Sequence, residues 1–234
     1  MKATNFLMVT GLIGCLMPGG LSAAVEAKTP TMTYIVDLSD NSTTITGASA
    51  GTFINIDDPQ AAGIAQYGSR LIERIGGMMV SEINSQLATR ETSETMDVMH
   101  LKDLKLPKQV PGKPTVTAVK RTSLMLRDMN NAPDAADRAA LDRIHDQLMA
   151  NETPDKIIVQ KIEHPGQPDE WRVYRPIATT QSCLACHGDP ATFKPAVKAV
   201  LEKMYPGDKA VDYRRQEYRG VLRVSMTAPV AAKK

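Results

Sequence analysis

The sequence has little of what several protein classes depend on. Three cysteines in 234 residues are too few for the disulfide framework of a small exported domain. The net charge is only +2, which excludes the strongly basic surface typical of a nucleic-acid-binding protein. Aromatic residues make up 4% while methionine occurs 13 times, so aliphatic and thioether side chains must fill the core. The 42% hydrophobic and 23% charged residues are those of an ordinary globular protein.

The N-terminus carries an apolar run that is too short to span a membrane. Lys2 precedes the run Phe6–Met17, and small residues follow at Ala24 and Ala27. A membrane-spanning helix needs about 20 apolar residues, whereas a secretory signal peptide has a basic start, a shorter apolar run and a small-residue cleavage site. We therefore expect a signal peptide over residues 1–27 and a periplasmic or otherwise exported mature protein without a transmembrane segment.

The segment Leu12–Cys15 within this run resembles a lipobox, which would place a lipid anchor on Cys15. The alternative is that Cys15 is an ordinary apolar residue of the signal peptide. Apolar residues continue past Cys15, where a lipoprotein would turn polar. This favours ordinary cleavage over lipidation.

Helical periodicity dominates the first part of the mature chain. Apolar residues recur at three-to-four spacing from Ile64 to Leu87, which predicts a long helix that begins near Asp58. Gly76-Gly77 interrupts this pattern, so we expect a kink or a close packing contact there. A shorter helix is expected from Thr92 to about Lys102, because Met96 and Met99 then share one face.

Strand-like runs dominate the rest of the chain, apart from a helix expected over Ala135–Ala150 with Leu141, Ile144 and Leu148 facing inward. The expected strands are Thr33–Val36 and Phe53–Ile56 in the extended Thr- and Ser-rich segment 28–57, Thr115–Ser123, Leu124–Arg127, Lys156–Glu163, Glu170–Pro176 and Gly220–Met226. The elements show no βαβ alternation. This order predicts an α+β fold with a small antiparallel sheet.

The most specific chemical signal is Cys183-Leu184-Ala185-Cys186-His187, the C-x-x-C-H pattern of covalent c-type haem attachment. Two thiols at this spacing add to the two vinyl groups of haem, and the next residue places an imidazole nitrogen under the iron. A thioredoxin-like redox pair would need a βαβ setting, and a structural zinc site would need further ligands at suitable spacing. The sequence offers neither, so it predicts one haem c, with His187 as the proximal ligand.

Three longer stretches resemble a family of periplasmic, PAS-like c-type haem domains, which occur alone or as sensory inputs of bacterial signalling proteins. The stretches are KRTSLMLRDMNNAPDAADRAAL (Lys120–Leu141), WRVYRPIATTQSCLACHGDP (Trp171–Pro190) and YPGDKAVDYRRQEYRGVLRVSM (Tyr205–Met226). The resemblance implies a PAS-like antiparallel sheet flanked by helices over residues 58–228, with one covalent haem c held against the sheet. Residues 229–234 then form a short tail.

The resemblance also concerns the second axial ligand of the iron. The family carries a cysteine there, in a pattern resembling C-H-L-K, and the matching residues here are Met99-His100-Leu101-Lys102. Met99 therefore takes the place of that cysteine, with His100 or an open position as alternatives. A neutral thioether favours ferrous iron more than an anionic thiolate does, so His/Met ligation implies a higher reduction potential.

Other cofactor contacts are expected from residues on or beside the strands. Arg121, Arg127 and Arg172 are candidates for charge-assisted hydrogen bonds to the haem propionates, and Arg175 is a further one. Tyr174 is a candidate for the lining of the pocket. The alternatives are ordinary surface arginines and an aromatic side chain that packs within the sheet.

Two kinds of function agree with these features. The first, which we expect, is single-electron transfer or redox sensing by a six-coordinate haem together with a redox partner protein. The second is a haem-based gas or redox sensor subunit with a labile distal ligand. A small haem enzyme ranks third, because it needs an open distal position and an acid or base beside it; His100 qualifies only if Met99 is unbound. We therefore expect no enzymatic activity.

Overall fold

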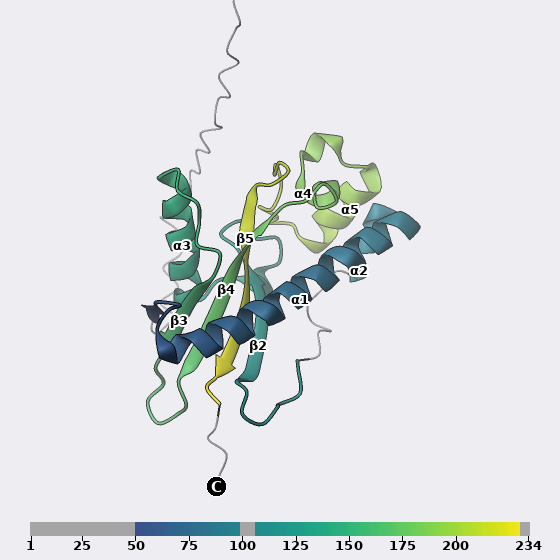
Figure 1. Cartoon of the computed structure of the whole chain (residues 1–234). Coiled ribbons are helices and arrows are strands. Elements are labelled where there is room, and N and C mark those ends of the chain that lie inside the picture. Colours follow the sequence, from purple (N-terminus) through teal and green to yellow (C-terminus); the bar gives the residue numbers. More distant parts are fainter. Residues whose placement is uncertain (1–49, 99–105, 230–234) are drawn as a thin grey trace, which may run out of the picture. The chain divides into compact units, whose positions relative to one another are not determined.

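The computed structural model describes residues 50–98 and 106–229 (Figure 1). One five-stranded antiparallel sheet, in the order β1-β3-β4-β5-β2, forms its centre. The strands are β1 (Thr52–Ile54), β2 (Thr115–Thr122), β3 (Ile158–Ile162), β4 (Glu170–Ala178) and β5 (Tyr218–Thr227). Helices pack on this sheet, which confirms the predicted α+β class. The expected strand Thr33–Val36 lies outside the described residues.

Helix α1 (Pro59–Thr89) crosses the strands diagonally and covers one face of the sheet (Figure 1). It begins where expected, because the Asp58 side chain accepts a hydrogen bond from Gln60 N at 2.8 Å and proline occupies the first turn. Its buried apolar stripe packs against strand residues whose side chains point to this face. The cluster comprises Ala61, Ile64, Ala65, Ile72, Ile75, Val116, Val159, Trp171, Val173, Leu222, Val224 and Met226.

The close contact expected at Gly76-Gly77 occurs elsewhere in this helix. A Cβ at either glycine would meet nothing within 4 Å, and α1 continues unbroken through both. A Cβ at Gly68 would lie 2.6 Å from Val173 Cγ2. The prediction was therefore wrong in position: Gly68 faces the sheet, whereas Gly77 is exposed to solvent.

Helix α3 (Ala135–Met149) packs on residues that point to the other face of the sheet. Its N-terminus is closed by a capping box in which the Asp134 and Asp137 side chains each accept the other's backbone N–H. Leu141 and Ile144 are fully buried against this face, as predicted. Leu148 was expected to point inward but is 38% exposed, because the apolar cluster does not extend to the last turn of α3.

The end of the sheet beyond Thr122 departs from the strand predicted for Leu124–Arg127. Strand β2 ends at Thr122, which pairs with Val221 of β5. The neighbouring residue of β5, Gly220, still pairs with Ile177 of β4 but has no partner in β2. The segment then turns away, and Leu126 O accepts a hydrogen bond from Lys209 N at 2.8 Å. The chain therefore leaves the sheet here and contacts the loop before β5.

Several short helices extend this end of the molecule. They are α2 (Thr92–Val98), η3 (Met129–Asn131), α4 (Leu184–His187), η4 (Pro190–Thr192) and α5 (Pro195–Met204). A small core of Met96, Phe193, Val197 and Leu201 joins α2 to α5, and Cys186 packs against it. No helix in the described ranges is long and apolar enough to cross a membrane.

Candidate functional site

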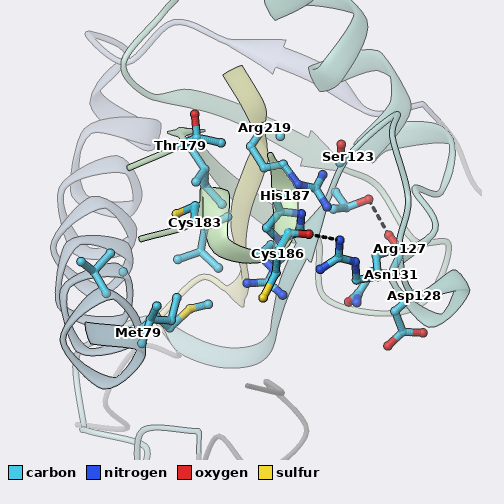
Figure 2. A pocket seen from close by; sticks show the side chains of 18 of the residues that line it. Met79, Ser123, Arg127, Asp128, Asn131, Thr179, Cys183, Cys186, His187 and Arg219 are labelled. Carbon is cyan, nitrogen blue, oxygen red and sulfur yellow. Dashed lines mark hydrogen bonds between the residues drawn. The ribbon is translucent and has the colours of Figure 1, made fainter. Parts of the chain in front are cut away.

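A cavity of about 700 Å³ lies beside α4, in the size range of small-molecule and cofactor sites. Elements far apart in the sequence form its walls, and Figure 2 shows α1 on one side and α4 with the strands on the other. The lining includes Met79 and Ile83 of α1, Met96 of α2, Arg121 of β2, Cys183, Cys186 and His187 at α4, and Arg219 of β5.

Helix α4 brings the two cysteines and the histidine of the C-x-x-C-H pattern to the same wall. Cys183 O accepts hydrogen bonds from Cys186 N at 3.2 Å and from His187 N at 2.9 Å, so the pattern forms a single tight turn. Neither cysteine is in a disulfide. Cys183 Sγ lies 3.2 Å from Thr180 Oγ1, while burial raises the pKa of the Cys186 thiol. The local helix therefore presents two thiols and one imidazole to one cavity.

The imidazole of His187 is held in a single tautomer. Its Nδ1 lies 2.7 Å from the carbonyl oxygen of Ala210, which can only accept, so Nδ1 carries the proton. Burial and the neighbouring Arg127 and Arg219 hold the pKa of His187 well below its usual value, so the ring is neutral. The remaining nitrogen, Nε2, therefore keeps a free lone pair, which is the state that a metal-binding histidine requires.

Arg127 lines the cavity, but the protein itself uses most of its hydrogen-bonding capacity. Arg127 Nε donates to Asp208 Oδ2 at 3.0 Å, and Nη2 donates to the carbonyl oxygens of Cys186 and Ala210 (Figure 2 shows the bond to Cys186). These bonds join α4 to the loop before β5. The structure thus gives Arg127 a role in holding the C-x-x-C-H turn, in addition to its place in the lining.

Two further arginines give the cavity an uncompensated positive charge. Burial lowers the pKa of Arg121, and the nearby Arg219 and Arg127 lower it further. Burial likewise lowers the pKa of Arg219, whose guanidinium stacks 5.3 Å from the centre of the Tyr213 ring. In the described part of the chain neither Arg121 nor Arg219 forms an ion pair with a carboxylate. An anionic group in the cavity would be stabilised by both.

Sequence reasoning missed Arg219 because the strand pattern is broken at that point. Strict alternation along β5 would place Arg219 on the same face as Arg223, which binds Asp137 of α3. A register shift at Ile177/Ala178 leaves Arg219 without a direct partner on β4, and Gly220 beside it adopts φ +147°. Arg219 therefore reaches the cavity. The alternation of residues along β5 does not predict this position, because the register shift is not visible in the sequence.

Arg172 and Tyr174 do not line the cavity. They alternate with Val173, whose side chain packs against α1, so both point to the α3 face. Arg172 binds Asp134 at 2.7 Å and Glu170 at 2.8 Å, and the Tyr174 hydroxyl donates to Gln160 Oε1 at 2.9 Å. The structure thus separates these two candidates from the cavity that holds Arg121 and Arg127.

Met99 and His100, the distal-ligand candidates, lie outside the described residues. The described part of helix α2 runs to Val98, and Met96 lines the cavity. The described chain therefore reaches the cavity wall shortly before Met99. Arg175, the remaining arginine candidate, binds Glu73 of α1 at 2.6 Å.

Comparison with known proteins gives one solved structure, described as the crystal structure of the cyanobacterial heme-protein Tll0287. It is 26% identical to this chain, with a TM-score of 0.36, and the match covers 50% of this chain and 63% of the other. The chain thus matches less than two thirds of that protein. No curated protein matches significantly. The Tll0287-like family profile, however, matches residues 50–227, which include every strand and the whole cavity wall described above, and the chain therefore belongs to the Tll0287-like family.

Proposed function

We propose that this protein binds one haem c covalently through Cys183 and Cys186, with His187 as the proximal axial ligand. The observation that carries the proposal is the convergence of both thiols and the neutral imidazole on one wall of a single cavity. The solved relative is a haem protein by its description. Haem iron supplies a centre that takes up and releases single electrons.

The lining of the cavity agrees with a large, mostly apolar and dianionic guest. Ile83, Met79 and Met96 offer apolar and thioether contacts, which suit a porphyrin ring. Arg121 and Arg219 offer half-buried positive charge without a carboxylate partner among the described residues. We assign these two arginines, rather than Arg172, to the haem propionates.

We propose Met99 as the distal ligand and His100 as the alternative. With Met99 bound, the iron is six-coordinate and has no vacant position for a substrate. The function that follows is single-electron transfer or redox sensing with a partner protein, in a periplasmic or otherwise exported setting, rather than enzymatic catalysis. A haem-based gas sensor is the alternative, and it requires that the distal ligand be displaced.

The test is to produce the protein in a host with c-type haem assembly and to measure haem that survives denaturation. Wild type should retain covalent haem, and the Cys183→Ser/Cys186→Ser double variant should lose it. Ser182→Ala is a matched control, because Ser182 lines the same cavity beside the cysteines but has no thiol. Haem that stays attached in the double variant after denaturation would refute the attachment.

Carbon monoxide separates the two functional alternatives in the same preparation. A ferric far-red band typical of methionine sulfur, with no carbon monoxide binding, supports the six-coordinate electron carrier. Prompt carbon monoxide binding by the ferrous protein means a displaceable ligand and favours the sensor.

A further inference from the structure

A buried chain of polar contacts ends on the imidazole of His187. Asp208 pairs with Arg127, whose Nη2 lies 2.9 Å from Asp208 Oδ2. The same Nη2 donates to Ala210 O at 3.2 Å, and Ala210 O also accepts the proton of His187 Nδ1 at 2.7 Å. The Ala210 carbonyl oxygen therefore accepts hydrogen bonds from both the Arg127 guanidinium and the His187 imidazole.

The protein encloses this chain of contacts, so water screens its charges weakly. The side chains of Arg127 and Asp208 are 12% and 9% exposed. Asp208 is fixed in turn, because its Oδ1 accepts a hydrogen bond from Ala210 N at 2.8 Å. Charges at this depth interact more strongly than at the surface.

We propose that Arg127 is a positioning residue that sets how strongly His187 donates electron density to the iron, acting through the Ala210 carbonyl. This inference rests on the proposed haem ligation by His187. A carbonyl that already accepts a cationic donor is a weaker acceptor for a second one. Arg127 thereby weakens the Nδ1–H···O bond, keeps the imidazole closer to neutral and favours ferrous iron.

Asp208 acts in the opposite direction. Its carboxylate offsets the positive charge of Arg127, so its removal would leave the guanidinium to polarise the carbonyl more strongly. The reduction potential should therefore fall when Arg127 loses its charge and rise when Asp208 loses its own. A residue with a merely structural role would give changes of the same sign at both positions.

The experiment compares wild type with Arg127→Gln, Asp208→Asn and the control Arg121→Gln, all with covalent haem. Arg121 is a cavity arginine with no bond to Ala210 O. Two quantities are measured: the reduction potential, and the ¹⁵N-edited proton shift of His187 Nδ1–H in the diamagnetic ferrous protein. The chain has only four histidines, which keeps the spectrum simple.

In Arg127→Gln we expect the N–H signal to move downfield and the potential to fall. In Asp208→Asn both should move the opposite way. Arg121→Gln should lower the potential but leave the N–H signal in place. An unchanged N–H signal in Arg127→Gln, or shifts of equal sign in the Arg127 and Asp208 variants, would overturn the inference.

Two outcomes concern proteins that hold no covalent haem. If the Arg127→Gln protein does not acquire haem, Asp208→Asn and Arg127→Lys decide the question, because both variants keep a cation at position 127. An unchanged His187 Nδ1–H signal in Asp208→Asn then refutes the inference. Should wild type hold no covalent haem, the proposed function fails and this inference falls with it. Haem attachment with unmoved signals overturns only the inference.

Discussion

Gly68 of α1 and Val173 of β4 lie so close that a Cβ on the glycine would be 2.6 Å from Val173 Cγ2. Met226 of β5 is also close, with its Cε 2.9 Å from the same position. Both partners are completely buried. The backbone of α1 therefore packs directly on the sheet at Gly68, and Met79 and Ile83, further along the same helix, line the cavity.

This contact predicts opposite effects for alanine at two glycines of the same helix. Gly68→Ala forces a methyl group into Val173 and should lower the free energy of unfolding by about 1–3 kcal/mol. Gly77→Ala should raise it by up to about 1 kcal/mol, because its Cβ meets nothing and alanine is the better helix former. Urea unfolding of both variants measures the difference. A Gly68→Ala protein as stable as wild type would mean that α1 does not pack as described.

Local patterns in the sequence were sufficient to predict most elements of the fold. Helix α1 follows from its apolar stripe and the start near Asp58, and helix α3 from its apolar residues Leu141 and Ile144. The strands at Ile158–Ile162 and Glu170–Ala178 follow from runs bounded by turn residues. Leu124–Arg127 was mispredicted because local pattern cannot show that β5 loses its pairing with β2 at Gly220 and keeps only β4 as a neighbour. Pairing between distant segments decides where a strand ends.

The candidate site was predictable only where its residues are adjacent in sequence. Cys183, Cys186 and His187 share one turn, so their spacing alone brings them together. The arginines were not predictable, because the face on which each one lies depends on the register of the sheet. Arg172 and Arg121 both lie on strands but face opposite sides of the sheet. Arg172 binds Asp134 and Asp137 beside α3, whereas Arg121 lines the cavity.

Replacing these two arginines should therefore affect different properties. Arg172→Gln should lower the free energy of unfolding by about 3 kcal/mol, as expected when a buried ion pair loses one partner. This is the lower end of the range, since Arg223 and Lys120 still bind Asp137. Its haem absorption spectrum should match wild type. Arg121→Gln should lower the reduction potential and leave urea unfolding of the haem-free chain unchanged or improved.

A result in which Arg172→Gln alters the reduction potential as much as Arg121→Gln does would place Arg172 at the haem after all. Circular dichroism at the working temperature shows whether each variant is folded before its potential is compared.

The same ion pairs predict how stability responds to acid. Burial, the largest single influence, would raise the pKa of Asp134 and of Glu170. The hydrogen bonds and the charge of Arg172, together with the other partners of each carboxylate, outweigh it and hold both pKa values below their usual range. A depressed folded-state pKa gives stability that is present above the unfolded value of about 4 and is lost as pH falls through the folded value. Wild type should thus lose stability as pH drops from about 5 to about 3.

Arg172→Gln provides the control for this pH dependence, because both carboxyl groups then lose the cation that depresses their pKa. Urea midpoints measured from about pH 6 to about pH 3 should fall less steeply in the variant than in wild type. Parallel curves for the two proteins would show that Arg172 does not control these carboxyl groups.

The identity of the distal ligand gives the last prediction. If Met99 binds the iron, Met99→Cys exchanges a neutral thioether for a thiolate, which stabilises ferric iron and should lower the reduction potential. Met99→Ala should remove the ferric far-red band and allow carbon monoxide to bind. Met78→Ala is the matched control, since Met78 is 49% exposed on α1 and should leave the spectrum unchanged. Spectra of Met99→Ala identical to wild type in both oxidation states would exclude Met99 as the distal ligand. His100→Ala should then change the spectrum and allow carbon monoxide to bind.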